Sequence, residues 1–280
     1  MTVAQALRDA AKRLEDVSDT ARLDAELLMA EALGVSRSEL LLRHMGDEAP
    51  PGFEGLLARR LGHEPVAYIL GRQEFFGRSF TVSPAVLIPR GDSECVVEAA
   101  LEACPSPARI LDCGVGSGAL LLTLLAERPE AQGVGIDRSE AALAVARANA
   151  EALGLLPRAK MLRRDWSEEG WQEGLGRFDL VIANPPYVED DAQLAPSVCF
   201  FEPAEALFAG NLGLDAYLSL VPQIPALLEL GGSVAFEIGA KQAEEVQHIA
   251  CEAGFSCILR RDLGGRPRAL IMRLGLGNGV

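Results

Sequence analysis

The chain has 280 residues, 49% of them apolar, and a formal net charge of −14 from 40 acidic and 26 basic residues. The apolar fraction excludes a disordered chain, and the length indicates one large domain or two of modest size. The acidic balance argues against a broad electrostatic grip on nucleic acid, which needs clustered Lys and Arg.

Membrane insertion and metal binding are also disfavoured. The longest apolar runs, such as 118–125, fall far short of the roughly 18–20 residues that a membrane helix needs. The N-terminal segment carries acids among its apolar residues, unlike a secretory signal, so we expect a soluble, cytoplasmic protein. The six cysteines form no Cys-x-x-Cys pair, and no Cys/His cluster has metal spacing, so we expect reduced thiols and no metal site.

Residues 1–73 predict a small bundle of four or five helices. Apolar residues such as Leu23, Leu27 and Leu33 recur near a helical period and end at Gly34, a typical helix stop. The next segment, 74–88, alternates apolar and polar residues and is rich in aromatic and β-branched side chains, which predicts a β-hairpin or an extended linker between two domains.

From residue 89 to 280, predicted strands and helices alternate. The predicted helices lie at 119–127, 140–152, 214–228 and 243–253. The predicted strands lie at 108–114, 133–137, 159–163, 178–183, 232–239, 256–262 and 268–274. Such alternation is typical of a mainly parallel, doubly wound sheet covered on both faces, so we expect an α/β domain after a small all-α domain.

A glycine-rich turn, DCGVGSGA at 112–119, follows the first of these predicted strands. Glycines allow a tight turn and a close approach of a ligand to the main chain at a helix N-terminus. Gly114, Gly116 and Ala119 fit the dinucleotide pattern GxGxxG/A. Gly114, Gly116 and Gly118, with the preceding acid, fit the DxGxGxG pattern of nucleoside-binding methyltransferases equally well. The turn alone does not decide between the two ligands.

Three further residues favour a nucleoside site at the ends of the next strands. Asp137 can accept hydrogen bonds from both hydroxyls of a ribose, in either class of enzyme. Asp165 and Trp166 can bind an adenine amino group and stack on its ring. A helix cap with Ser139, and ordinary core packing for the tryptophan, are the alternatives.

The sequence Asn184-Pro185-Pro186-Tyr187 follows a buried strand, at the sheet edge where α/β proteins bind ligands. Two prolines stiffen the turn and remove two donors, so its carbonyls are free to accept hydrogen bonds. The Asn184 side chain and the Pro185 carbonyl can hold an NH₂ group while its nitrogen attacks an electrophile, with Tyr187 as an aromatic wall. These dipoles stabilise the charge that develops on the nitrogen, so no nearby base is required.

With these motifs in place, the chain resembles the protein-(glutamine-N5) methyltransferases that modify peptide chain release factors, the HemK/PrmC family. The resemblance covers nearly the whole chain. Its matching stretches are RLDAELLMAEALG at 22–34, EPVAYILGRQEFFG at 64–77, VLIPRGDSE at 86–94, the glycine turn, NPPY and FEPAEAL at 201–207. NPPY alone is shared with adenine-N6 methyltransferases of DNA and RNA, whereas the combination is more specific. One departure is Gly91, where the family commonly has a proline after Ile-Pro-Arg; glycine loosens this loop.

The resemblance implies a seven-stranded class I methyltransferase domain with an antiparallel last strand, residues 89–280. It implies S-adenosylmethionine (SAM) as methyl donor and the glutamine of the Gly-Gly-Gln loop as acceptor, a modification that modulates translation termination. The residues expected to line the methionine and ribose of the cofactor are Gly114, Val115, Gly116, Ser117 and Gly118.

The resemblance also assigns roles at the other motifs. Asp137 is expected to bind the ribose and Trp166 the adenine side; Asp165, from the reading of the residues above, is also expected to bind the cofactor. The residues expected to hold the glutamine amide are Asn184, Pro185, Pro186 and Tyr187, with Asn184 also touching the cofactor. Arg90 either positions the substrate or the SAM carboxylate or is a plain surface arginine, and Glu237 is either a site acid or a satisfied buried carboxylate.

A release factor is therefore the expected partner, and the helical block 1–73 is expected to recognise it outside the Gly-Gly-Gln loop. We expect no direct contact with nucleic acid or membrane. We expect a monomer, because a protruding protein loop must enter the site. The alternatives are an adenine-N6 methyltransferase, a SAM-sensing scaffold without activity, and an NAD oxidoreductase, which has no use for NPPY.

Overall fold

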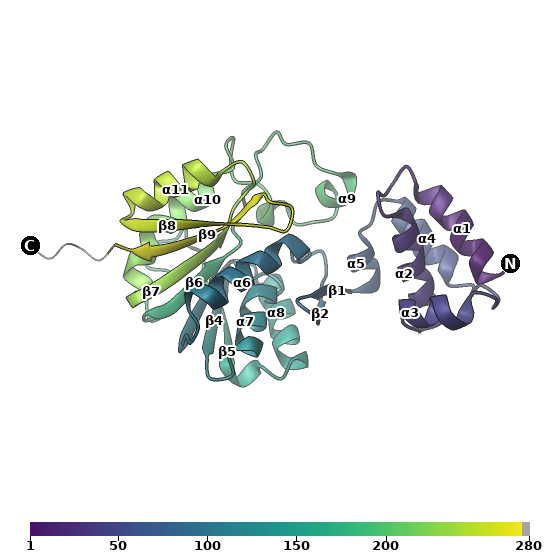
Figure 1. Cartoon of the computed structure of the whole chain (residues 1–280), viewed down its shortest axis with the longest axis horizontal. Coiled ribbons are helices and arrows are strands. Elements are labelled where there is room, and N and C mark those ends of the chain that lie inside the picture. The colour runs from purple at the N-terminus through teal and green to yellow at the C-terminus, as the bar shows by residue number, and fades with distance from the viewer. Residues whose placement is uncertain (276–280) are drawn as a thin grey trace, which may run out of the picture. The chain divides into compact units, whose positions relative to one another are not determined.

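The computed structural model describes residues 1–275, which form two compact units. One unit comprises residues 1–72 together with 194–201, and the other comprises residues 73–193 together with the chain from Glu202 onward (Figure 1). Within the described part of the chain, no helix is both long and apolar enough to span a lipid bilayer.

The first unit is helical. Its elements are α1 (Val3–Leu14), α2 (Ala21–Leu33), α3 (Arg37–Glu39), a π-helical turn (Leu40–His44), α4 (Phe53–Leu61), α5 (Val66–Leu70) and α9 (Pro196–Cys199). A capping box begins α1: Thr2 Oγ1 accepts a hydrogen bond from the Gln5 amide, and Gln5 Oε1 accepts one from the Thr2 amide. Helix α1 buries Val3, Leu7 and Leu14, so its apolar face forms part of the core of this unit.

Helix α2 ends at a left-handed glycine and is tied to α4 near its start. It stops at Gly34, whose left-handed φ of 69° suits glycine, as its sequence predicts. At the other end, Thr20 makes no side-chain cap; its hydroxyl donates to Asp24 instead, at 2.9 Å. Asp24 also pairs with Arg60 of α4 at 2.7 Å, with both side chains 8% exposed. This buried ion pair ties α2 to α4.

Strands β1 (Arg72–Phe75) and β2 (Arg78–Thr81) form a small two-stranded sheet. The turn between them is Phe76-Gly77, with φ values of 50° and 69°. A left-handed conformation is unfavourable for a bulky residue, and the Phe76 amide is held by Glu94 Oε1 at 2.8 Å. The hairpin is therefore anchored to the start of the helix that follows it in the α/β unit.

The second unit is built on a seven-stranded sheet in the order β5-β4-β3-β6-β7-β9-β8. Its strands are β3 (Arg109–Cys113), β4 (Gln132–Asp137), β5 (Ala159–Arg163), β6 (Phe178–Ala183), β7 (Leu228–Glu237), β8 (Phe255–Arg261) and β9 (Pro267–Leu274). Strands β3 to β7 pair in parallel, whereas β9 is antiparallel to both of its neighbours. The predicted α/β class and the antiparallel last strand are confirmed.

Helices cover both faces of this sheet (Figure 1). On one face lie α6 (Glu94–Ala103), α7 (Ala119–Glu127) and α8 (Glu140–Ala152), and on the other α10 (Asp215–Leu220) and α11 (Ala243–Glu252). Successive strand residues point to opposite faces: Ile110 and Leu180 pack with the first layer, Leu111 and Val181 with the second. This explains why the strands read as continuous apolar runs.

The prediction of one helix over 214–228 is wrong beyond Leu220. The chain is α-helical over Asp215–Leu220 and continues as a 3₁₀ helix over Val221–Leu227. Pro225 lies inside that second segment, where a proline lacks the amide that an α-helix needs. In this 3₁₀ helix the Gln223 side chain donates to the Trp166 carbonyl and accepts a hydrogen bond from the Trp171 indole.

Candidate active site

The glycine turn between β3 and α7 is shaped by its backbone. Gly114, Gly116 and Gly118 have φ values of 81°, 52° and 85°, which L-residues rarely adopt. The amides of Gly114 and Val115 both donate to the Ile136 carbonyl at 2.9 Å, which fastens the turn to β4. A Cβ on Gly118 would stand 2.8 Å from a methyl of Leu122. The turn therefore needs glycine both for its conformation and for space.

Asp137, at the end of β4, links this turn to the next helix. Its Oδ2 accepts from the Gly116 amide at 3.0 Å and its Oδ1 from the Ser139 amide at 2.9 Å. Burial raises the pKa of Asp137, while the two backbone donors favour its ionised form. Ser139 does cap α8, accepting from the Ala142 amide, so the cap is made by the serine and the carboxylate keeps lone pairs for a ligand.

Asp112, the last acid before the turn, is a buried carboxyl that our site prediction omitted. It is 1% exposed, and its Oδ1 has no hydrogen-bond partner among residues 1–275. Burial raises the pKa of Asp112 to about 8, against an opposing hydrogen bond from Leu121. An orphaned acceptor beside a cavity indicates a group that a ligand satisfies. Its place at the start of the DxGxGxG pattern was the available signal.

The predicted adenine side lies across the same turn. Trp166 stands over Gly114, where an added Cβ would meet the indole ring at 3.3 Å. Asp165 Oδ1 accepts from both the amide and the hydroxyl of Ser167, at 2.9 and 2.7 Å, and these bonds oppose the effect of burial and lower its pKa. The tryptophan therefore packs on the glycine turn while the acid shapes the loop.

These groups line one cavity of about 380 Å³, within the size range of small-molecule sites. It lies wholly in the α/β unit. Its lining includes nine of the residues singled out from the sequence: Gly114, Val115, Gly116, Ser117, Asp137, Asp165, Trp166, Asn184 and Pro186. Four others are not part of that lining: Gly118, Pro185, Tyr187 and Arg90.

The Asn-Pro-Pro-Tyr loop follows β6 and is tied down at its far end. The Tyr187 carbonyl accepts from Gln242 Nε2 at 3.0 Å, and the Tyr187 phenol donates to Glu237 Oε1 at 3.1 Å. Gln242 also donates to the carbonyls of Leu212 and Gly213. Nothing in the local sequence marks Gln242, because its contacts join segments far apart in the chain.

Arg90 is fastened to a buried acid. Its guanidinium pairs with the Glu202 carboxylate, which also accepts from the Ile88 amide at 3.1 Å. Glu202 belongs to the FEPAEAL stretch, so two of the family-like segments meet at this ion pair. Gly91, the departure from the family pattern, begins a 3₁₀ turn over Gly91–Ser93 and does not prevent this anchoring.

Comparison with known proteins agrees with this geometry. Residues 5–71 match the model of the PrmC N-terminal domain, and residues 106–249 match a methyltransferase domain. The release factor glutamine methyltransferase of Geobacter sulfurreducens is 41% identical over 265 residues, covering 92% of this chain and 91% of that protein. The protein of the same description from Cereibacter sphaeroides is 42% identical over 283 residues, covering 98% of this chain and 99% of the relative. A crystal structure of a methyltransferase from Pyrococcus furiosus shares the fold at a TM-score of 0.53 and 17% identity, covering 80% of this chain and 100% of that one.

The fold and the cavity define a class I SAM-dependent methyltransferase. The sheet order, the glycine turn after β3 and the acid after β4 are those expected of that class. Within it, the chain belongs to the family of release factor glutamine methyltransferases, with which it aligns over nearly its whole length. The resemblance inferred from the motifs is thereby confirmed.

The cavity fits the methyl donor that this class and family imply. Gly114 and Gly116 line the cavity without side chains, so the backbone of the turn is open to a ligand there. The orphaned Oδ1 of Asp112 offers an acceptor for a cationic group such as an ammonium. The donor and acceptor set therefore suits a charged amino-acid nucleoside.

Proposed function

We propose that this enzyme transfers the methyl group of SAM to the side-chain amide nitrogen of the glutamine in the Gly-Gly-Gln loop of a peptide chain release factor. The observation that carries the proposal is that Asn184 and the glycine turn line the same cavity. Asn184 belongs to the Asn-Pro-Pro-Tyr loop, residues 184–187, which we call the acceptor loop. A turn of the nucleoside-binding type and two residues of the Asn-Pro-Pro-Tyr loop, Asn184 and Pro186, thus line one space. The curated relatives named above carry this activity in their names.

The cofactor half of the cavity would be held mainly by backbone. Bound SAM supplies an electrophilic methyl group. In this proposal the turn from Gly114 to Gly118 holds its methionine and ribose portions, and Asp137 accepts from the ribose hydroxyls. Trp166 and Asp165 bind the adenine side, and Asp112 pairs with the amino group.

The acceptor half would orient a poor nucleophile. An amide nitrogen is unreactive because its lone pair is delocalised. In this proposal Asn184 Oδ1 and the Pro185 carbonyl accept its two N–H bonds, which turns the lone pair away from both oxygens. The new C–N bond forms as the C–S bond breaks, and the nitrogen, positive in the transition state, is stabilised by the same two dipoles before it loses a proton to solvent.

Intact-protein mass spectrometry of a purified release factor, after incubation with this enzyme and SAM, tests the proposal. We expect a gain of about 14 Da on the wild-type factor and none on a Gln→Ala variant of its Gly-Gly-Gln loop. Equal methylation of both factors would refute the assigned acceptor. Methyl transfer to an oligonucleotide but not to the factor would favour the adenine-N6 alternative, against which the net charge of −14 argues.

We further propose that the helical unit recognises the factor outside its Gly-Gly-Gln loop, and that the enzyme acts as a cytoplasmic monomer without touching nucleic acid. Leu42 in this unit is 82% exposed, and Leu230 in the α/β unit is 98% exposed. We expect Leu42→Glu to raise KM for the intact factor, with unchanged kinetics on a Gly-Gly-Gln peptide, and Leu230→Glu to change neither. Light scattering of the enzyme alone and with factor tests the monomeric state.

A further inference from the structure

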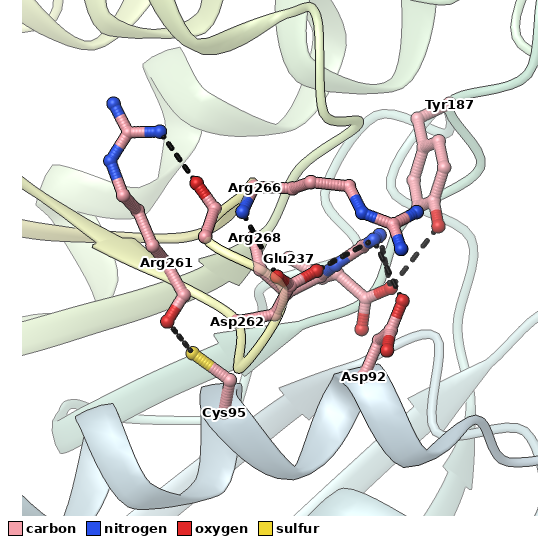
Figure 2. A network of polar contacts seen from close by, with 9 residues as sticks. Asp92, Cys95, Tyr187, Glu237, Arg261, Asp262, Arg266 and Arg268 are labelled. Carbon is pink, nitrogen blue, oxygen red and sulfur yellow. Dashed lines mark hydrogen bonds and ion pairs between the residues drawn. The ribbon is translucent and has the colours of Figure 1, made fainter.

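A network of charged side chains lies behind the acceptor loop, outside the lining of the cavity (Figure 2). The Arg268 guanidinium, which is 10% exposed, faces three carboxylates: Asp92 at 2.9 Å, Asp262 at 3.4 Å and Glu237 at 3.9 Å. Glu237 in turn accepts the hydrogen bond from the Tyr187 phenol. The network therefore ends on the last residue of the acceptor loop.

The sheet holds Glu237 and Arg268 side by side. Glu237 ends β7 and pairs with Ala269 in the antiparallel β7–β9 ladder, and the Arg268 carbonyl accepts from the Ile238 amide at 2.9 Å. The Tyr217 phenol donates to the Glu237 carbonyl at 2.9 Å. Because the backbone at Glu237 is fixed from two sides, its carboxylate is a stationary partner for the tyrosine.

Burial of these charged groups costs desolvation free energy, so the network is not an efficient way to stabilise the fold. Glu237 is 1% exposed, and desolvation raises its pKa, while Ser93, Arg268 and Tyr187 act in the opposite direction. Apolar replacements of a buried ion pair are often as stable as the pair itself, so stability alone is a weak reason for such a network. The network contacts the acceptor loop through the Tyr187–Glu237 hydrogen bond, which indicates a role in positioning that loop.

We propose that Glu237 and Arg268 form a positioning pair that fixes Tyr187 and, through it, the acceptor carbonyl of the preceding Pro-Pro segment. The inference rests on the proposed function. The near end of the loop is already fixed, because Ala183 pairs with both β3 and β7. The far end has the Gln242 bond to the Tyr187 carbonyl and the Glu237 bond to its phenol.

Arg268 acts on the tyrosine through the carboxylate. It favours the ionised form of Glu237, which accepts the phenol hydrogen bond more strongly than a neutral carboxyl does. Asp92 and Asp262 hold the guanidinium in place, and Asp262 is itself fixed by the Arg266 amide at 2.9 Å. None of these groups needs to touch the substrate. Neither Glu237 nor Arg268 is therefore a catalytic residue.

Four single variants and one double variant test the positioning role with purified release factor as substrate. We expect Tyr187→Phe and Glu237→Leu each to lower kcat by about 10–100-fold, since small misplacements of reacting groups have effects of this size. Their double variant should lose less than about threefold more than either single variant, because both remove one interaction. Glu237→Gln keeps an acceptor and should recover most of kcat, and Arg268→Met should fall between. SAM affinity should stay within about threefold throughout. Additive losses, or weakened SAM binding in step with kcat, would refute the pair.

Hydrogen exchange of residues 184–190 gives a readout that does not depend on any substrate. The Val188 amide donates to the Leu207 carbonyl at 2.8 Å and the Asp190 amide to the Gly210 carbonyl at 3.1 Å, so both report on the loop. We expect faster exchange there in Tyr187→Phe and Arg268→Met, with unchanged exchange in the glycine turn. Arg60→Met, which breaks the buried pair of the helical unit, should lower the melting temperature without this local change.

Methylation of the release factor and hydrogen exchange of the loop together distinguish a failure of the proposed function from a failure of the positioning role. If wild-type enzyme leaves the release factor unmodified, the proposed function fails and the exchange data still decide the positioning role. If the factor is modified but loop exchange in the Tyr187 and Arg268 variants equals that of wild type, the positioning pair is refuted and the function stands. Should Glu237→Leu fail to fold, Tyr187→Phe, Glu237→Gln and Arg268→Met carry the same test.

Discussion

The glycine turn and the Asn-Pro-Pro-Tyr loop, which both contribute to the lining of the cavity, are held in different ways. The glycine turn is fixed by its own backbone, through left-handed glycines and amides that bond to β4 and Asp137. The acceptor loop is fixed by side chains from elsewhere, Gln242 and Glu237, that reach its last residue. The cofactor half is thus local in sequence, while the acceptor half depends on the assembled sheet. Substitutions in the two halves should separate cofactor affinity from turnover.

The largest expected effect is at Asn184, the side chain proposed to hold the amide of the acceptor. We expect Asn184→Ala to lower kcat/KM by about 10²–10³-fold, the usual loss when one preorganised dipole at a developing charge is removed. SAM affinity, measured by calorimetry, should change by less than about threefold if this loop acts on the acceptor. The exposed Asn211→Ala is the control, with both quantities unchanged. A large loss of SAM affinity in Asn184→Ala would move this residue to the cofactor half.

The next effect lies on the glycine turn. Gly118→Ala combines a left-handed φ of 85° with a methyl contact of 2.8 Å to Leu122, so either the Leu122 side chain or the turn itself must shift. We expect SAM affinity to fall by about 10–100-fold and unfolding free energy by about 2–4 kcal/mol.

Gly34→Ala is the matched control, because Gly34 is also left-handed, with φ of 69°, but has open space around it. We expect it to cost about 1 kcal/mol and to leave SAM affinity unchanged. Equal effects of the two substitutions on stability and affinity would show that the contact with Leu122 plays no part in the turn.

Smaller changes in kcat and in SAM affinity should distinguish two glutamines that anchor the acceptor half and the cofactor half of the cavity. Gln242 holds the carbonyl of Tyr187, and Gln223 holds the carbonyl of Trp166 at 3.0 Å. We expect Gln242→Leu to lower kcat by about 3–10-fold with little change in SAM affinity, and Gln223→Leu to do the reverse, as hydrogen bonds of this kind contribute about 0.5–1.5 kcal/mol. The same change in both variants would mean that the halves are not independent.

Much of this architecture could be predicted from local patterns. Ala119–Glu127 and Glu140–Ala152 are helical over the predicted residues, because glycine and Ser139 mark their starts and apolar residues recur along them. The prediction of a single α-helix over 214–228 is wrong in its second half, where a 3₁₀ helix contains Pro225.

The residues of the site also divide into those that local sequence patterns predict and those that they do not. The glycine turn and Asp137 are recognisable from adjacent residues, and the structure brings them to one cavity. Gln242 and Arg268 were missed, since they meet Tyr187 and Glu237 through the β7–β9 pairing and a turn after β7, which no short motif records. Glu237, left open between site acid and buried carboxylate, is buried and bonded to the acceptor loop.

A further effect concerns pH and the cofactor half of the cavity. The folded protein raises the pKa of Asp112 to about 8, whereas an unfolded chain restores a value near 4. Between these values the folded state holds a proton that the unfolded state has lost. Stability therefore falls as pH rises from about 4 to 8, by at most about 1.4 kcal/mol per pH unit from this group. Asp112→Asn cannot titrate, so it removes this slope.

Melting temperatures of both proteins at pH 5.5, 6.5 and 7.5, without SAM, measure the difference. We expect Asp112→Asn to gain on wild type by up to about 3–6 °C for each pH unit, since the melting temperature of a domain of this size shifts by about 2–4 °C per kcal/mol. A constant difference across this range would mean that Asp112 is ionised throughout, as an ordinary carboxylate is. A cationic group bound at its orphaned Oδ1 would favour the ionised form, so saturating SAM should flatten the wild-type slope toward that of the variant. The Asp112 carboxyl would then be neutral in the free cavity and charged once the cofactor is bound. The acceptor loop differs in this respect, because its hydrogen-bond partners are in place before any ligand binds.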